Sequence, residues 1–258
     1  MRTDIVDLHG FYASSLGTAA AALIIEQLRA AWPDERGCRV AGFGYCEPFL
    51  KAFPDAERTI AMAPAGQGVI RWPTGEPNRA SLVAEHHWPL PDASVDRLLI
   101  AHGLEETGKP QQLMREAWRV LSDQGRVIII ASHRRGAWSM VDSTPFAAGR
   151  PYLNGQLKRL LVDAMFTPAR VARALYLPPL QTRIVVRAAN SWEKTGALLW
   201  PWLGGILLIE ARKDLARPAT RALRAQRRLT APSRPAFAQP SSRDRNNLPD
   251  FRNDSIER

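Results

Sequence analysis

The sequence predicts an α/β protein built on a mostly parallel, seven-stranded sheet. Short apolar runs typical of buried strands alternate with amphipathic helical segments between residues 14 and 131. These strands carry few polar residues, as expected when helices cover both faces of a sheet. The last two predicted strands, 169–177 and 205–211, have no clearly marked helix between them. We therefore expect an antiparallel hairpin to close the sheet.

The first half of the chain supplies three strands and two helices. A long amphipathic helix is expected over 14–32, opened by Ser14 and closed by Pro33. A short helix with a proline in its first turn is expected over 47–53. Residues 65–79 are rich in glycine and proline and are expected to be irregular. The predicted strands of this half are 38–43, 58–62 and 80–86.

The pattern becomes sharper in the middle of the chain. A strand is predicted over 94–102, and a helix over 109–121 carries its apolar residues on one face. A turn containing Gly125 leads into an apolar strand at 126–131, and one more amphipathic helix is expected over 155–166. Regular alternation of this kind favours parallel pairing.

The longest apolar run is Gly196–Ile209. Its 14 residues fall short of the roughly 20 that a membrane-spanning helix needs, and Pro201 and Gly204 interrupt it. We interpret it as a buried loop followed by a strand, and we expect no membrane span.

The positive charge is concentrated at the carboxyl end. The 258 residues carry a formal charge of +10, and residues 214–258 contain ten arginines and five acidic residues. That segment has few apolar residues, so we predict a domain over 1–213 and a disordered basic tail over 214–258, with room for a short helix at 217–228. The tail arginines suit contacts with nucleic-acid phosphates, and a solvated extension is the alternative.

Three further features bear on the class of protein. The amino-terminal residues lack the basic and apolar regions of a secretory signal, so we expect a cytoplasmic protein. Cys38 and Cys46 lack metal-ligand spacing, and we interpret them as small apolar residues. His86 and His87 are adjacent in a predicted strand and point to opposite faces, so no metal site is expected.

The stretch "RVAGFGYCEPFL" follows the pattern of a strand, a tight turn and the start of a helix. Gly42 and Gly44 lie in the turn. Glycines at such a turn let the backbone approach a ligand without Cβ collisions.

Residues 88–130 carry a more specific signature: Leu-Pro-Asp before the fourth strand, Ser-x-Asp opening it, His-x-Leu-Glu after it, and Arg-Val-Leu-x-x-x-Gly-Arg before the fifth. This block resembles the class I S-adenosylmethionine (SAM)-dependent methyltransferases of the type 11 branch, and residues 143–166 are similar to a segment of a bacterial subgroup. The resemblance covers Tyr12 to Lys213. It implies a Rossmann-like sheet, SAM as the cofactor and a small molecule as the methyl acceptor.

The resemblance also assigns site residues. In the family the first loop follows an acid and reads Gly-x-Gly-x-Gly, but here Val40 holds the acid position and Cys46 the third glycine. The stretch from Met62 past the end of the second strand has no carboxylate for the ribose. Glu47, Glu85, Gln67 and Gly66 are candidate replacements. The expected cofactor-binding residues are Gly42, Gly44, Glu47, Met62, Glu85 and His102.

His102 is also the first candidate for a general base, because it follows the fourth strand at the edge where ligands bind. The alternative is that it packs at the strand end and hydrogen-bonds a loop carbonyl. Trp138, Tyr152 and Trp192 are candidates to line an apolar acceptor pocket, with a place in the core as the alternative.

Three functions remain open at this point. The chain is an active SAM-dependent methyltransferase, a catalytically inactive methyltransferase fold that serves as a binding or regulatory module, or a nucleic-acid-associated protein that uses its arginine-rich tail. The missing carboxylates favour the second, because a charge-assisted hydrogen bond contributes about 1.5–3 kcal/mol.

Overall fold

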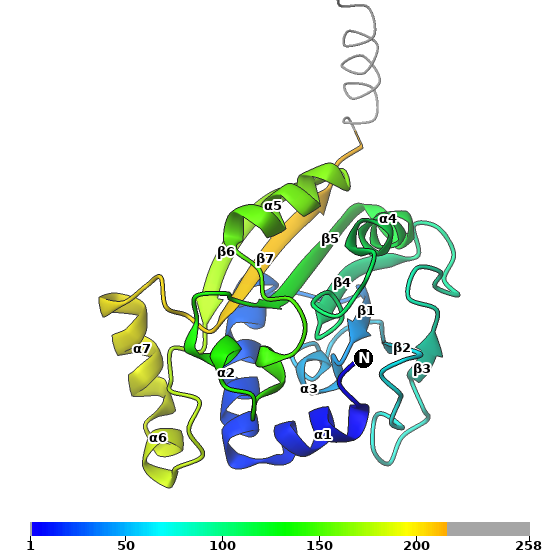
Figure 1. The fold of residues 1–258 in the computed structure, drawn as a ribbon. Helices are drawn as coiled ribbons and strands as arrows, with labels where there is room; N and C mark the ends of the chain where they lie inside the picture. Colours follow the sequence, from blue (N-terminus) through cyan, green and yellow to red (C-terminus); the bar gives the residue numbers. More distant parts are fainter. Residues whose placement is uncertain (1, 216–258) are drawn as a thin grey trace, which may run out of the picture. The chain divides into compact units, whose positions relative to one another are not determined.

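A computed structural model describes residues 2–215 of the chain (Figure 1). Their strands form one sheet of order β3-β2-β1-β4-β5-β7-β6. The strands are β1 (Arg39–Gly44), β2 (Arg58–Pro64), β3 (Ala80–Val83), β4 (Val95–Ala101), β5 (Leu121–Ser132), β6 (Phe166–Ala174) and β7 (Ile206–Lys213). Only β7 runs antiparallel to its neighbours β5 and β6. The predicted seven-stranded sheet with a reversed final strand is confirmed.

Helices cover both faces of this sheet, as predicted. They are α1 (Ile5–Ala13), α2 (Ser15–Ala31), α3 (Glu47–Leu50), α4 (Pro110–Val120), α5 (Asn154–Asp163), α6 (Arg183–Arg187) and α7 (Ala189–Leu199). Helices α1, α2 and α3 pack with Leu99 and Ile128 in one core cluster. Helices α4 and α5 pack with Leu98 and Val127 in the other. Neighbouring residues of one strand thus serve opposite faces.

Helix α1 was not predicted. Its apolar residues Ile5 and Leu8 are spaced for a helix, but only nine residues take part and Gly10 interrupts them. Asp4 caps its first turn, because the side-chain oxygen accepts a hydrogen bond from the Val6 N–H at 2.8 Å. Ser14 then ends α1 and caps α2.

The interpretation of the apolar run Gly196–Ile209 as buried was wrong for its first half. Its opening residues belong to α7, and its middle contains exposed large side chains; apart from Gly196, the buried residues of the run are 204–209, which lead into and begin β7. Helices α6 and α7 were also missed between β6 and β7. Helix α7 buries only Ala189 and Gly196, so its sequence lacks the broad apolar stripe that identifies a helix.

Three smaller differences concern element ends. Strand β3 stops at Val83, so Glu85 and His86 lie in a turn after it. Strand β5 already starts at Leu121, where it pairs with Val95, and therefore includes the predicted turn. The predicted tail from residue 216 onward and its helix at 217–228 lie outside the described residues.

No single described helix is long and apolar enough to cross a bilayer; α1 and α2 reach that composition only when taken together, and they meet at 88°.

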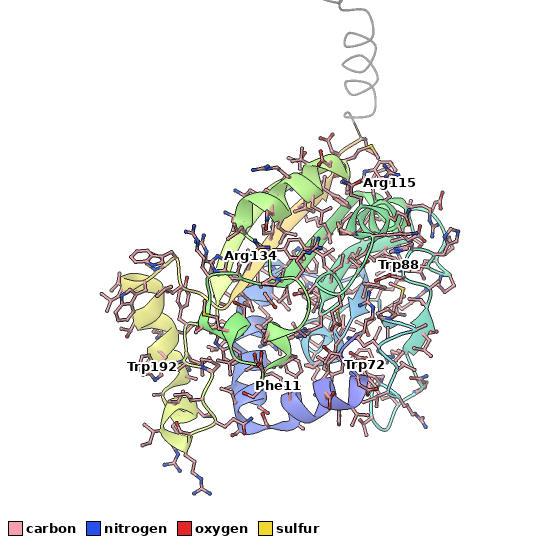
Figure 2. All side chains as sticks on the ribbon, in the orientation of Figure 1. Phe11, Trp72, Trp88, Arg115, Arg134 and Trp192 are labelled. Carbon is pink, nitrogen blue, oxygen red and sulfur yellow. The ribbon has the colours of Figure 1, made fainter. Side chains whose placement is uncertain are left out.

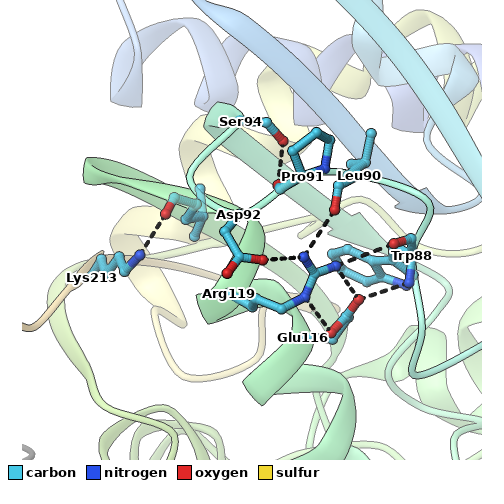
Figure 3. A network of polar contacts seen from close by, with 9 residues as sticks. Trp88, Leu90, Pro91, Asp92, Ser94, Glu116, Arg119 and Lys213 are labelled. Carbon is cyan, nitrogen blue, oxygen red and sulfur yellow. Dashed lines mark hydrogen bonds and ion pairs between the residues drawn. The ribbon is translucent and has the colours of Figure 1, made fainter.

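The residues that carry the family signature hold the amino-terminal side of β4 in place (Figure 3). The Arg119 guanidinium donates to the carbonyls of Leu90 at 2.9 Å and Trp88 at 3.2 Å. It also pairs with Asp92 and Glu116. These contacts raise the Arg119 pKa, chiefly through the hydrogen bonds with Glu116. The Leu-Pro-Asp part of the signature is thus fixed to α4.

Asp96 of the Ser-x-Asp motif has a similar role. Its carboxylate accepts two hydrogen bonds from the Arg39 guanidinium, at 2.9 and 3.0 Å. The pKa of Asp96 is lowered to about 2, first by this side-chain bond. Both motifs therefore organise the fold and leave the chemistry to other residues.

Candidate functional site

The candidate site lies at the carboxyl ends of β1, β2 and β4, the edge of an open α/β sheet where ligands bind. Helix α1 runs along this edge, and the chain start lies beside it (Figure 1). The N–H of Ile5 donates to the carbonyl of Gln67 at 2.8 Å, just after β2. Thr3 donates to Glu106, after β4, from its N–H at 2.8 Å and from its hydroxyl at 2.7 Å. The amino-terminal segment is thus bonded to the loops that follow the strands.

Glu85, one of the predicted cofactor-binding residues, also contacts the amino-terminal segment. It forms an ion pair with Arg2, and His86 Nε2 lies 3.4 Å from its other oxygen. Its carboxylate is therefore occupied by the Arg2 guanidinium and the His86 ring.

His102 is buried at the same edge. Its Nε2 shares a hydrogen bond of 2.7 Å with the Tyr12 hydroxyl, and the Tyr12 ring stacks on Tyr45 at 5.5 Å. Burial lowers the His102 pKa to about 3, so the ring is neutral and weakly basic at neutral pH. The ring bonds a tyrosine hydroxyl instead of the loop carbonyl considered from the sequence.

Both glycines of the first loop are in contact with protein atoms. Gly44 has φ +88°, and a Cβ on it would lie 2.1 Å from the Ala101 carbonyl oxygen. A Cβ on Gly42 would lie 2.5 Å from the Cys46 Cβ. The Cys46 thiol donates to the Phe43 carbonyl at 3.3 Å. Packing of the chain on itself therefore already requires these glycines.

Met62 belongs to the core. It is 3% exposed and packs in the cluster that contains Phe43 and Trp88. The candidates for the acceptor pocket are also separated from one another. Trp138 is buried beside Phe146, Tyr152 belongs to the core cluster on the opposite sheet face, and Trp192 is exposed.

Glu47 differs from these residues because no other side chain among the described residues pairs with its carboxylate, and only the nearby backbone N–H groups of Glu47 and Cys46 favour its charged form. It is 6% exposed, and neither carboxylate oxygen makes a hydrogen bond among the described residues. Desolvation raises its pKa to about 7. It opens α3 directly after the glycine loop, where the amino end of a helix favours negative charge. A buried carboxylate without a partner is costly unless a ligand supplies one.

A cavity of about 440 Å³ adjoins Glu47. This size suits a small-molecule site. It lies between α1, the start of α3 and the loop after β2, and is lined by His9, Tyr12, Ala13, Tyr45, Glu47, Pro48, Lys51, Ile70, Arg71, Trp72, Pro73 and Thr74. We call it the Glu47 cavity. One carboxylate, two cationic side chains and several aromatic rings suit a zwitterion with an aromatic part.

A second cavity of about 620 Å³ lies on another face of α1. Its walls include Asp7 and Phe11 of α1 and residues 142–145, 147 and 148, and we call it the Asp142 cavity. Phe11 lines this cavity, Tyr12 lines the Glu47 cavity, and the two rings meet edge-on at 5.0 Å. Helix α1 therefore forms the wall between them.

Sequence reasoning found Glu47 but missed the residues that α1 and the loop after β2 bring to it. Tyr12, Lys51 and Trp72 follow no motif. Gln67, named as a replacement anchor, is 1% exposed and its Oε1 has no partner. A search for unpaired buried polar groups finds both Glu47 and Gln67, whereas a motif search does not.

Comparison with known proteins agrees with this fold. Residues 28–129 match the family described as a methyltransferase domain. No curated protein matches the sequence significantly. A SAM-dependent methyltransferase from Thermotoga maritima, described as a possible histamine N-methyltransferase, has a TM-score of 0.57 at 14% identity, over 81% of this chain and 96% of that one. A SAM-dependent methyltransferase from Archaeoglobus fulgidus has a TM-score of 0.52 at 16% identity, over 75% and 94% of the two chains.

The [4+2]-cyclase SpnF also matches, with a TM-score of 0.52 at 17% identity, over 75% of this chain and 80% of that one. Similarity at this level establishes the fold and leaves the reaction to the site residues. The domain match supports SAM as the cofactor, in agreement with the resemblance. Residues 28–129 are thus similar to a methyltransferase domain, and the described residues have the class I SAM-dependent methyltransferase fold.

Proposed function

We propose that the protein transfers a methyl group from SAM to a small molecule, and that the Glu47 cavity holds the cofactor. The observation that carries this proposal is the buried Glu47 carboxylate, which has no partner and adjoins a cavity beside the glycine loop. When bound, SAM supplies an electrophilic methyl group on a sulfonium. The residues of the cavity suit its other charged and aromatic parts.

Each part of the cavity has a proposed role. The Glu47 carboxylate pairs with the ammonium group of the cofactor, and a cation there lowers the Glu47 pKa again. Lys51 and Arg71 face the same cavity and pair with the carboxylate of the ligand. Tyr45 and Trp72 supply aromatic surface for the adenine or the sulfonium. We propose that His102 positions Tyr12, since its low pKa makes it a poor base.

Helix α1 has to move for the reaction. Methyl transfer needs donor and acceptor in line and in contact, but Phe11 and Tyr12 separate the Glu47 cavity from the Asp142 cavity. A shift of α1 that joins the two cavities brings the acceptor, bound on the Asp142 side, to the cofactor. Return of α1 excludes water from the site.

The second candidate function is that of a binding module without catalysis. The observation that favours it is the filling of the glycine loop by the chain's own atoms, with Cys46 against Gly42 and the Ala101 carbonyl against Gly44. In that case the Glu47 cavity binds a ligand other than SAM, or none.

Calorimetric titration of the full chain with SAM separates these functions. We expect saturable binding at micromolar SAM, and Glu47→Gln should weaken it by at least about tenfold, because one charge-assisted hydrogen bond is lost. Glu57→Gln removes an exposed carboxylate just before β2 and is the matched control, with unchanged affinity expected. Absence of binding at millimolar SAM would refute the methyltransferase proposal and leave the binding module. Equal affinity of both variants would refute the role of Glu47 alone.

A further inference from the structure

The carboxyl end of α7 carries a cluster of exposed apolar side chains that the candidate site does not use. Five large residues lie within six positions: Leu198, Leu199, Trp200, Trp202 and Leu203. Leu198 is 80% exposed and Trp202 is 55% exposed. We call these five residues the α7 tip. Apolar surface gathered in this way marks an interaction site, whereas scattered exposed apolar residues are normal.

The α7 tip is held firmly by the body of the domain. A Cβ on Gly196 would lie 2.4 Å from the Tyr176 Cβ, and one on Gly204 would lie 3.1 Å from the Tyr176 Cζ. The Glu193 carboxylate accepts hydrogen bonds from the Leu175 N–H at 3.0 Å and the Tyr176 N–H at 2.8 Å. Close packing at two glycines therefore fixes the position from which the apolar side chains point outward.

Several backbone groups of the tip form hydrogen bonds within the protein. The N–H of Trp200 donates to the Gly196 carbonyl at 2.9 Å, and the N–H of Leu203 donates to the Trp200 carbonyl at 2.9 Å. The Pro201 carbonyl accepts from the Tyr176 hydroxyl at 3.0 Å. Backbone groups that enter lipid must be satisfied internally, because no water is available there. These groups of the tip meet this condition.

The exposed charged side chains of α6 and α7 have one sign. Arg183, Arg187 and Lys194 are exposed on α6 and α7. The only acidic residue between 180 and 203 is Glu193, and its carboxylate is bonded to backbone N–H groups of the body. Figure 2 shows α6 and α7 along one side of the domain, with Trp192 on α7. Basic residues near a membrane surface are attracted by anionic lipid headgroups.

We propose that the α7 tip docks the protein on an anionic lipid bilayer. Tryptophan and leucine side chains at the end of a helix, with arginine and lysine beside them, match the composition of elements that lie in the membrane interface. The indoles of Trp200 and Trp202 enter the headgroup region together with the leucines. Arg183, Arg187 and Lys194 remain at the lipid phosphates. This docking brings the methyltransferase domain to a membrane surface without a spanning helix.

Vesicle binding by the full chain tests this proposal. The probe is vesicles of equal parts phosphatidylcholine and phosphatidylglycerol, compared with phosphatidylcholine alone, with bromine-labelled lipid as a quencher of tryptophan emission. The wild type should bind the anionic vesicles more tightly and show quenching. The double variant Trp200→Ser/Trp202→Ser should bind on the order of tenfold more weakly and lose the quenching, because less apolar surface enters the bilayer.

The matched control is Met140→Ser, which removes a side chain that is 72% exposed but is not one of the five tip residues. It should bind like the wild type. All variants keep the arginine-rich segment beyond residue 215, so equal binding by wild type and double variant would assign the binding to that segment and overturn the proposal. Absence of wild-type binding would also overturn it. The proposal would also be overturned if the wild type did not bind vesicles but formed a dimer that the double variant abolishes. In that case a second copy of the chain would occupy the tip.

Discussion

Buried carboxylates have cationic partners at one end of the parallel strands and lack them at the other end, among the described residues. At the amino ends, Glu116 pairs with Arg119 at 2.6 Å and Glu210 pairs with Arg126 at 3.0 Å. At the carboxyl ends, Glu47 has no partner, and Oε2 of Glu105 has none among the described residues. Desolvation accordingly raises the pKa of Glu47 to about 7 and that of Glu105 to about 6.

This difference distinguishes a structural end from a functional end. A paired buried charge has little to gain from a ligand, whereas an unpaired one is destabilised until a ligand arrives. Perturbed carboxyl groups next to a cavity are therefore candidates for function. The Leu-Pro-Asp and Ser-x-Asp parts of the motif lie at the paired end, whereas His102 and Glu105 of the same motif follow β4 at the carboxyl end. The parts at the paired end therefore do not establish the chemistry.

The largest effect on stability is expected at the amino ends of the strands, where the buried carboxylates are paired. Arg119→Ala leaves the Glu116 carboxylate buried without its cation and frees the carbonyls of Trp88 and Leu90. The free energy of unfolding should fall by about 2–4 kcal/mol. The measurement is urea denaturation of the full chain.

Arg115→Ala on the same helix is the control for this change. Arg115 is exposed on α4, at the upper right of the domain in Figure 2, and its loss should change stability by less than about 0.5 kcal/mol. Equal effects of the two substitutions would contradict the structural role of Arg119.

The second prediction concerns Glu47→Gln, which should raise the free energy of unfolding by an amount that depends on pH. The folded-state pKa of Glu47, about 7, lies above the value of an unfolded chain, so the native state loses stability as pH rises from about 4.5 through 7. Glu47→Gln removes this loss. The variant should be more stable than wild type by about 1–3 kcal/mol at pH 8 and no more stable than wild type near pH 4.

Thermal or urea unfolding at the two pH values checks this prediction, with Glu57→Gln as the exposed control. A variant that is less stable than wild type at pH 8 would show that Glu47 has a partner in the native state. The same substitution that stabilises the free protein should weaken SAM binding, which is a pattern typical of a functional residue.

The smallest effect on stability is expected in α1, which lies over the carboxyl ends of the strands. Tyr12→Phe removes the hydroxyl that bonds His102 and keeps the ring that stacks on Tyr45. Stability should fall by about 1 kcal/mol, as for one buried hydrogen bond. Hydrogen exchange of the α1 amides should become faster, while that of α4 stays unchanged. Unaltered exchange in α1 would mean that this bond does not hold the helix.

The sequence by itself determined the sheet. The alternation of apolar strands and amphipathic helices is a local pattern, because burial of each element depends mainly on its own periodicity. The mostly parallel pairing and the reversed β7 followed from it, whereas the resemblance to the methyltransferases rested on the motifs of residues 88–130. Glu47 was also identified, from its place at the start of a helix after the glycine loop.

Only the tertiary structure decided what surrounds these residues. Whether Gly44 faces a ligand or the Ala101 carbonyl depends on β4, which lies far away in the sequence. The cover that α1 forms over the strand ends, the isolation of Glu47 and the outward direction of the α7 tip likewise depend on contacts between distant segments. Local patterns specify which face of an element is apolar, and packing of the whole chain decides which charges remain unpaired and which apolar residues remain exposed.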